Sequence, residues 1–227
     1  MLAQDTGVTF DIDNFLDPGG FTSSINILLA MSVVTLIPFI LISTTCFLRI
    51  VIVLSMVRQA LATQQAPPNM ILIALATFMT IFVMTPTFQK VIDTAVTPYN
   101  EGTITQKQAY NLAFQPFRHF MLKFTREKDL ALFLEFSKIK VTQNLEEVPI
   151  YVIIPAFIIS ELKAAFQIGF LLFIPFIVID LIISNILLSL GMFMLSPAMI
   201  SLPFKILLFV LTDGWNLIIR GLLISFS

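Results

Sequence analysis

Six charged side chains lie within long apolar stretches of this sequence, where a charge is expensive to bury. They are Arg49, Glu161, Lys163, Asp180, Lys205 and Asp213. An ionisable group in such surroundings needs an opposite charge or a water-filled cavity beside it. Residues of this kind therefore mark ion paths or contacts between subunits. Glu161 and Lys163 are two positions apart and point in different directions on a helix. We therefore expect each of them to find its partner elsewhere.

Unpaired charges of this kind allow two functions. If Glu161 and Asp180 lie near the middle of a membrane, they form the relay of a proton or ion transporter. If the charges meet partners on neighbouring copies, they hold an oligomer together, and pairing between segments of one copy stays an equal alternative for any single pair. A chain with about four apolar segments is small for a rocking-bundle transporter, which favours the oligomer.

Other chemistry has little support in the sequence. Cys46 is the only cysteine and His119 the only histidine, so an internal disulfide, a cysteine-based metal cluster and a His–His metal site are excluded. Cys46 lies in an apolar run, where we expect it to pack as a small hydrophobic residue. No glycine-rich phosphate loop, zinc motif or nucleophile elbow is present. We expect no enzyme and no cofactor.

The composition predicts contact with lipid or with other subunits. Apolar residues make up 57% of the 227 and charged residues 12%, against about 25% charged in soluble domains. A chain of this size has too little interior to hide so much apolar surface. Its 13 lysines and arginines nearly balance its 14 aspartates and glutamates, so nothing indicates nucleic-acid binding.

The hydropathy pattern predicts an all-α protein with about four long, kinked apolar helical segments. The first segment, from Ile25 to Val57, is longer as a helix than a bilayer core is thick, so we expect it to be tilted, broken near Pro38 or not a simple span. We expect interior prolines and charges to interrupt the segment from Pro149 to Leu190. The chain divides into a polar leader without a signal-peptide pattern (1–24), a first helical hairpin (25–89), a helical insertion (90–148) and a second hairpin (149–227) with a loop at 191–197.

The insertion has the pattern of a small helical subdomain. Apolar residues recur at three- and four-residue steps from Ala109 to Phe124, which is typical of one helical face. The spacing of Thr103 and Gln106 predicts a capping box at its start, and Thr125 is expected to cap a second short helix.

Three apolar residues, Met192, Phe193 and Met194, lie in the turn from Gly191 to Pro197. Because methionine side chains adapt to many shapes, a ring of such loops can close a pore as a hydrophobic constriction. Ordinary packing of an apolar turn is the alternative, and the residues alone favour it.

Specific strings add a resemblance that covers nearly the whole chain, from Ile25 to Phe226. They resemble the FliP family of type III secretion export-gate proteins at Ser160–Phe170 (SELKAAFQIGF), Leu190–Pro197 (LGMFMLSP), Leu202–Lys205 (LPFK), Leu208–Trp215 (LFVLTDGW) and Ala66–Asn69 (APPN). Within the insertion, Thr125–Phe133 is similar to the flagellar branch of that family. An injectisome homologue is the alternative within the family.

The resemblance implies a homopentamer that assembles with FliQ-, FliR- and FlhB-type subunits in the bacterial inner membrane, within the flagellar basal body. Unfolded flagellar proteins would pass through it. It also implies that the hairpins form a conical helical stack raised out of the bilayer, with the insertion 90–148 in the periplasm.

Particular residues take roles from the same resemblance. Met192, Phe193 and Met194 would form the gasket of the closed gate, where Phe193 departs from the family's run of three methionines. Glu161 and Lys205 match charged family positions that we expect to pair between neighbouring subunits.

Overall fold

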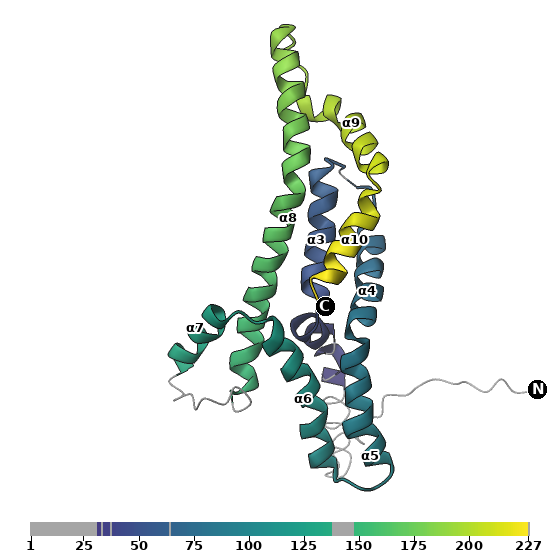
Figure 1. The fold of residues 1–227 in the computed structure, drawn as a ribbon, viewed down its shortest axis with the longest axis vertical. Helices are drawn as coiled ribbons and strands as arrows, with labels where there is room; N and C mark the ends of the chain where they lie inside the picture. Colours follow the sequence, from purple (N-terminus) through teal and green to yellow (C-terminus); the bar gives the residue numbers. More distant parts are fainter. Residues whose placement is uncertain (1–30, 33, 37, 64, 138–147, 227) are drawn as a thin grey trace, which may run out of the picture. The chain divides into compact units, whose positions relative to one another are not determined.

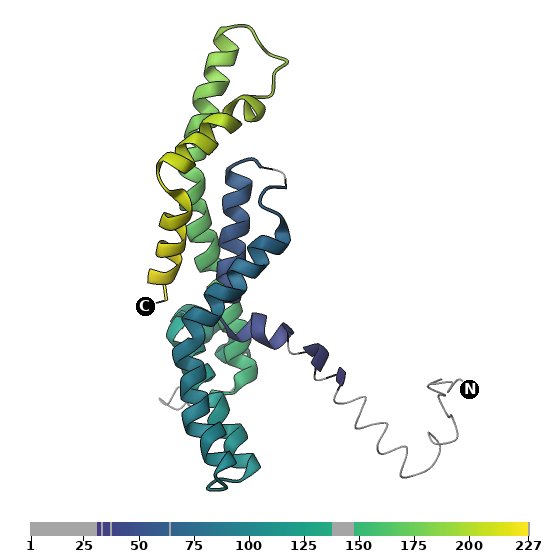
Figure 2. The same ribbon diagram turned by 90° about the vertical axis from the view of Figure 1, so that its right-hand side faces the viewer.

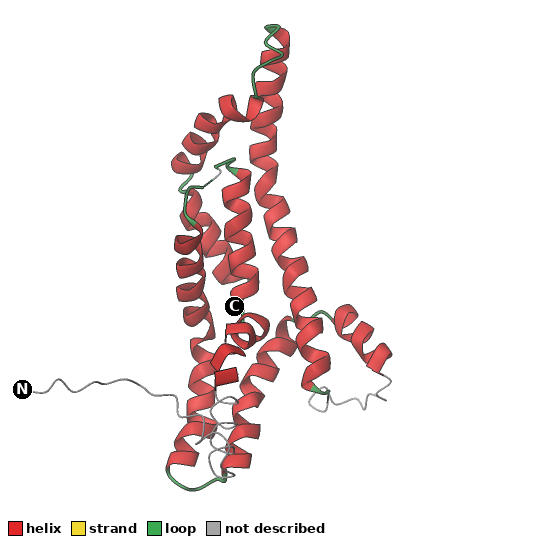
Figure 3. Cartoon of the chain, turned by 180° about the vertical axis from the view of Figure 1, so that it is seen from behind, coloured by secondary structure: helices red, strands yellow, loops and turns green. Residues whose placement is uncertain are grey.

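The structure, a computed structural model, describes residues 31, 32, 34–36, 38–63, 65–137 and 148–226. It divides into two compact units, 1–41 and 42–227. In the first unit the described residues are helical, and the hydroxyl of Thr35 donates to the carbonyl of Ser32 at 2.8 Å. The leader predicted at 1–24 lies outside the described residues. No strand occurs in the described ranges, which confirms the prediction of an all-α fold (Figure 3).

The second unit is a set of helices around α3 (Figure 1). α3 packs against α8 on one side and α4 on another, and α6 packs against α4. Figure 2 shows α9 turning back from the end of α8 and α10 continuing after a bend, which measures 63°. The elements are α3 (Phe47–Ala60), α4 (Asn69–Val91), the π-helix η1 (Ile92–Val96), α5 (Thr97–Asn100), α6 (Gln106–Phe124), α7 (Glu127–Ser137), α8 (Ile150–Ser189), α9 (Pro197–Leu211) and α10 (Gly214–Ile224).

Helix length and hydropathy agree with about four apolar segments. Among the described residues, α8 and the continuous helical stretch Asn69–Asn100 are each long and apolar enough to cross a membrane. Two further pairs pass the same test together, namely Val34–Thr44 with α3 and α9 with α10. The membrane-protein-like fold class is therefore confirmed.

The prediction that α8 would be interrupted is wrong. It is one helix of 40 residues that contains Pro155 and Pro175, and at 1.5 Å per residue it is about 60 Å long. Each proline removes only one backbone hydrogen bond, and the turns on either side keep the helix continuous. α8 is thus about twice as long as the ~30 Å hydrocarbon core of a bilayer is thick.

Of the three alternatives for the first apolar segment, the structure shows a break, but it does not lie near Pro38. Pro38 is helical, whereas the helix that contains it ends at Thr44 and α3 begins at Phe47. The Thr45 hydroxyl accepts a hydrogen bond from the Phe47 N–H at 3.3 Å, so a side chain satisfies one of the unpaired donors at the start of α3. Cys46, in the same break, is fully buried in the apolar core, as predicted.

The insertion is helical, but its caps differ from the prediction. α6 begins with a capping box formed by Thr105 and Gln108, not by Thr103 and Gln106. Thr103 belongs to the preceding turn, where its N–H and its hydroxyl both donate to the Pro98 carbonyl. The hydroxyl of Thr125 donates back to Met121, so Thr125 closes α6 instead of starting α7. The predicted apolar face of α6 is buried at its C-terminal end, at Phe120 and Met121.

Candidate functional site

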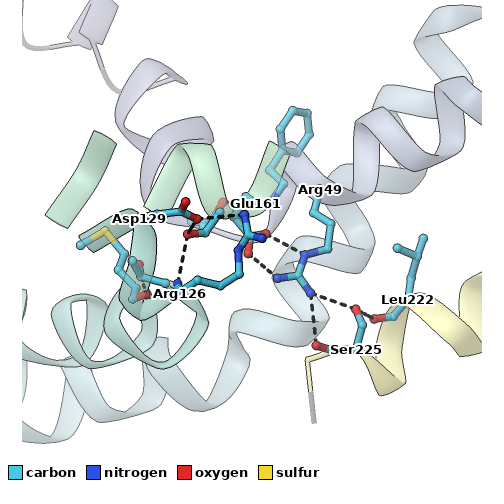
Figure 4. A network of polar contacts seen from close by, with 11 residues as sticks. Arg49, Arg126, Asp129, Glu161, Leu222 and Ser225 are labelled. Carbon is cyan, nitrogen blue, oxygen red and sulfur yellow. Dashed lines mark hydrogen bonds and ion pairs between the residues drawn. The ribbon is translucent and has the colours of Figure 1, made fainter. Parts of the chain in front are cut away.

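A buried ion pair joins the beginning of α3 to the first third of α8 (Figure 4). Arg49 and Glu161 are 5% and 0% exposed. The Nε of Arg49 donates to Oε2 of Glu161 at 3.0 Å, and Nη2 of Arg49 donates to Oε1 of the same carboxylate. This two-point geometry matches the planar guanidinium to the carboxylate and fixes the position of α3 along α8.

The same guanidinium also holds the C-terminal end of the described chain. Nη1 of Arg49 donates to the carbonyl and to the hydroxyl of Ser225, each at 3.2 Å (Figure 4). Its central carbon lies 4.0 Å from the ring centroid of Phe226 and 5.6 Å from that of Phe124. Arg49 therefore connects α3, α8, α6 and the residues after α10 through one side chain.

A second set of polar contacts fastens α7 to α8 beside this pair. The Ser160 hydroxyl donates to Asp129 at 2.7 Å and accepts from the Arg126 N–H at 3.1 Å. Arg126 and Asp129 are 2.9 Å apart as an ion pair. We did not predict roles for Ser160, Arg126 or Asp129 from the sequence. The available signal was the position of Ser160, a polar residue next to Glu161 in an apolar run.

A third polar cluster lies at the opposite end of α3. Lys205, which is almost fully buried, donates to Asp180 at 2.7 Å and to the Ala60 carbonyl at 3.3 Å. Asp180 also accepts from the Ser201 hydroxyl at 2.5 Å. Ala60 is the last residue of α3, where carbonyls lack helical partners and carry partial negative charge, so the ammonium of Lys205 stabilises that end.

Four of the six predicted charged residues thus have partners within one chain. Arg49 pairs with Glu161, and Asp180 pairs with Lys205. This is the intrachain alternative that the sequence left open. The expected contacts of these residues with neighbouring subunits stay a prediction.

The other two charges differ from these four. Lys163 and Asp213 are exposed, and neither has an ion-pair partner among the described residues. Lys163 lies on α8 beside exposed apolar residues such as Phe166 and Phe170. Asp213 adopts a left-handed conformation (φ 51°) at the bend between α9 and α10. Their expected contacts with neighbouring subunits also stay a prediction.

The turn between α8 and α9 presents its apolar side chains outward. Gly191 has φ 71°, and two hydrogen bonds close the end of α8, from Met192 N–H to Leu187 at 2.9 Å and from Gly191 N–H to Leu188 at 3.1 Å. This is a Schellman motif, which uses glycine because a side chain is strained in that conformation. Beyond it, Phe193 is 76% and Met194 100% exposed. The loop does not pack into the core of its own chain.

Much of the second hairpin is exposed and apolar in the same way. Large apolar side chains point outward along α8 beyond residue 169 and along α9. An exposed surface of this kind requires lipid or protein to cover it. The exposed members on these two helices include Phe170, Leu171, Leu181, Met199, Leu207, Val210 and Leu211.

The sequence is similar to those of known proteins along most of its length. The sequence profile of the FliP family matches residues 30–222. Flagellar biosynthetic protein FliP of Bacillus subtilis (strain 168) is 53% identical over 210 residues, which cover 92% of this chain and 95% of that protein. The FliP of Caulobacter vibrioides is 50% identical over 197 residues (87% and 74%), and that of Borreliella burgdorferi is 44% identical over 230 residues (99% and 91%). These matches span the helices, the buried charge pairs and the exposed loop, and the chain belongs to the FliP family.

Proposed function

We propose that this chain is a pore-forming subunit of the flagellar protein export gate, through which unfolded flagellar proteins cross the bacterial inner membrane. The observation that carries the proposal is the exposed apolar loop Met192–Met194, held between two apolar helices by the Schellman motif at Gly191. Its side chains have no place in their own chain, and a ring of copies would bring them together.

In this proposal the subunits form a ring, a pentamer by resemblance, and the loops meet at its centre. Flexible methionine side chains fill an irregular gap, and a constriction lined by apolar side chains excludes water and ions. Phe193 adds a stiffer side chain to this seal. The exposed apolar faces of α8 and α9 would pack between subunits, which explains why a chain with few charges exposes so many large apolar residues.

The length of α8 supports a position partly outside the bilayer. A helix of about 60 Å exceeds the ~30 Å hydrocarbon core even when tilted by the usual ~20°. A stack of helices that rises out of the membrane accommodates this length, and the insertion 90–148 would then lie in the periplasm. FliQ-, FliR- and FlhB-type subunits are the expected partners in the basal body.

The flagellar assignment is favoured over the injectisome because the relatives from Bacillus, Caulobacter and Borreliella are all named as flagellar biosynthetic proteins. An ion transporter that uses Glu161 and Asp180 has less support. The two acids are 19 residues apart on α8, which corresponds to about 28 Å, and each is bound by a basic residue.

The test is a leak assay on the assembled complex. The chain with the triple substitution Met192→Gly, Phe193→Gly and Met194→Gly is co-expressed in cells with its FliQ- and FliR-type partners. We expect dissipation of the membrane potential, measured with a voltage-sensitive dye, because the apolar seal is gone. Met70→Gly is the control, since Met70 is also a largely exposed apolar residue (82%) but lies at the start of α4.

Assembly is measured in parallel by the native mass of the purified complex. A ring that retains several copies of the triple variant and still holds the membrane potential would rule out the loop as the seal. A chain that stays monomeric in the presence of its partners would rule out the gate itself.

A further inference from the structure

A basic cavity lies between α4 and α6, away from the loop at 192–194. It has a volume of about 290 Å³, and its lining includes Lys90, Thr94, Gln115, Arg118 and His119. A second hollow of about 200 Å³ shares Lys90 and His119 with the first and adds Lys123. Because they share lining residues, the two hollows adjoin and form one basic cleft. Its volume is near the lower end of the range for small-ligand sites.

The charge of this cleft is one-sided. Among the residues that the structure describes, no aspartate or glutamate lines either hollow. In the part of the chain that the structure describes, no carboxylate lies within 4.0 Å of a side-chain nitrogen of Lys90, His119 or Lys123. Asp93, one turn from Lys90, accepts a hydrogen bond from Gln89 at 3.1 Å and does not line the cleft. An anion in the cleft would therefore supply a charge that the described residues do not.

The wall of the cleft contains an irregular helical turn. Between α4 and α5 the chain forms the π-helix η1, and Thr94 from this turn faces the first hollow. On the opposite wall, Pro116 interrupts the hydrogen bonding of α6. π-Helical turns inside α-helices occur frequently at functional sites, because the extra residue displaces the helix wall. Two helix irregularities thus face each other where the basic residues gather.

The cleft also adjoins an apolar helix surface. α4 exposes Phe78 and Phe82 toward its surroundings, and Val83 and Pro86 of the same helix line the second hollow. Lys90 follows Phe82 by eight residues, which corresponds to about 12 Å along the helix. A basic site directly beyond an apolar helix surface suits a ligand with an anionic head and a hydrocarbon chain.

We propose that the cleft between α4 and α6 binds a phosphate group, supplied by the head of an anionic phospholipid whose acyl chains lie along α4. Lys90 and Lys123 contribute positive charge from two helices, and the side-chain amide of Gln115 offers a hydrogen-bond donor. A bound headgroup would bridge α4 to α6. This site does not depend on the export function proposed above.

The first measurement is lipid retention by the full chain, purified with its partners and exchanged into nanodiscs of phosphatidylglycerol or phosphatidylcholine. Native mass spectrometry counts the phospholipids that stay bound. The double variant Lys90→Gln and Lys123→Gln removes two charges from the cleft. Since each lysine near an anionic lipid surface contributes about a fivefold factor, we expect phosphatidylglycerol to bind about 25-fold more weakly, with little change for phosphatidylcholine.

The matched control is Lys107→Gln with Lys128→Gln, which removes two exposed charges of the same insertion that line neither hollow. His119→Gln is a second variant, on the wall that both hollows share. Phosphatidylglycerol retention that falls in the cleft variants and not in the control supports the site.

A separate arm distinguishes the source of the phosphate. If inorganic phosphate at millimolar concentration displaces the retained lipid, the cleft recognises the phosphate group alone and a soluble phosphate is its occupant. If it does not, the acyl chains along α4 contribute and the occupant is a lipid. Equal retention of phosphatidylglycerol by the cleft variant and the control, or no binding of either probe, would overturn the proposal.

Discussion

The substitution Glu161→Gln tests whether the buried pair with Arg49 holds the helices together. Glutamine has nearly the same shape as glutamate, so the cavity stays filled while the negative charge is lost. It accepts only part of the hydrogen bonding that the carboxylate receives from Nε and Nη2 of Arg49. Arg49, which is only 5% exposed, would then keep its positive charge without a counter-charge.

The expected loss of unfolding free energy in Glu161→Gln follows from the contacts that Arg49 keeps. Removal of one member of a buried ion pair typically costs about 3–5 kcal/mol. Arg49 keeps its bonds to Ser225 and its position over the Phe226 ring, and a cation–π contact contributes about 0.5–2 kcal/mol. We therefore expect about 3 kcal/mol, at the lower end of the range. For a chain of this length that lowers Tm by roughly 6–12 °C.

The assay is thermal unfolding of the detergent-purified chain, followed by circular dichroism at constant detergent concentration. Glu135→Gln is the control, because Glu135 is exposed on α7 and has no ion-pair partner among the described residues. The double variant Arg49→Met with Glu161→Gln removes both charges and should recover part of the loss. A Tm for Glu161→Gln within about 1 °C of the unsubstituted chain would refute the reasoning.

Three further predictions concern the bend, the loop and the exposed charges. Gly214→Ala places a Cβ 2.4 Å from the Phe209 ring, so we expect the unfolding free energy to fall by about 1–3 kcal/mol. Thermal unfolding measures this, and a Tm equal to that of the unsubstituted chain would contradict the packing. In Gly191→Ala the added Cβ meets no atom within 4 Å, so only the backbone strain at φ 71° destabilises the variant. We expect a loss of about 1–2 kcal/mol of unfolding free energy in the same assay, and a variant more stable than the unsubstituted chain would contradict this. Lys163→Glu reverses one exposed charge and Asp213→Asn removes the other, with a side chain that also tolerates the left-handed conformation. Both should leave the Tm of the single chain unchanged and lower the yield of complex by native mass; unchanged assembly in both variants would remove these residues from the interface.

The sequence by itself determined the helices and where most of them lie. Long apolar runs form helices because a backbone without access to water must satisfy its own hydrogen bonds, and among single segments only a helix does so. The turn at 191–197 was equally predictable, since Gly191 ends α8 in a left-handed conformation and Pro197 begins α9. The family resemblance was also carried by strings of residues and needed no coordinates.

Only the tertiary structure decided how the charges pair. Arg49 and Glu161 are 112 residues apart, and nothing in that separation indicates contact. Lys205 reaches Asp180 because α9 folds back along α8, and it reaches Ala60 because α3 ends at the same level. The break at Thr45–Cys46 instead of Pro38 was decided in the same way. The free energy of burying a charged side chain in an apolar region depends on its neighbours in space. A helix therefore tolerates a proline or a charge wherever packing supplies the missing hydrogen-bond or ion-pair partner.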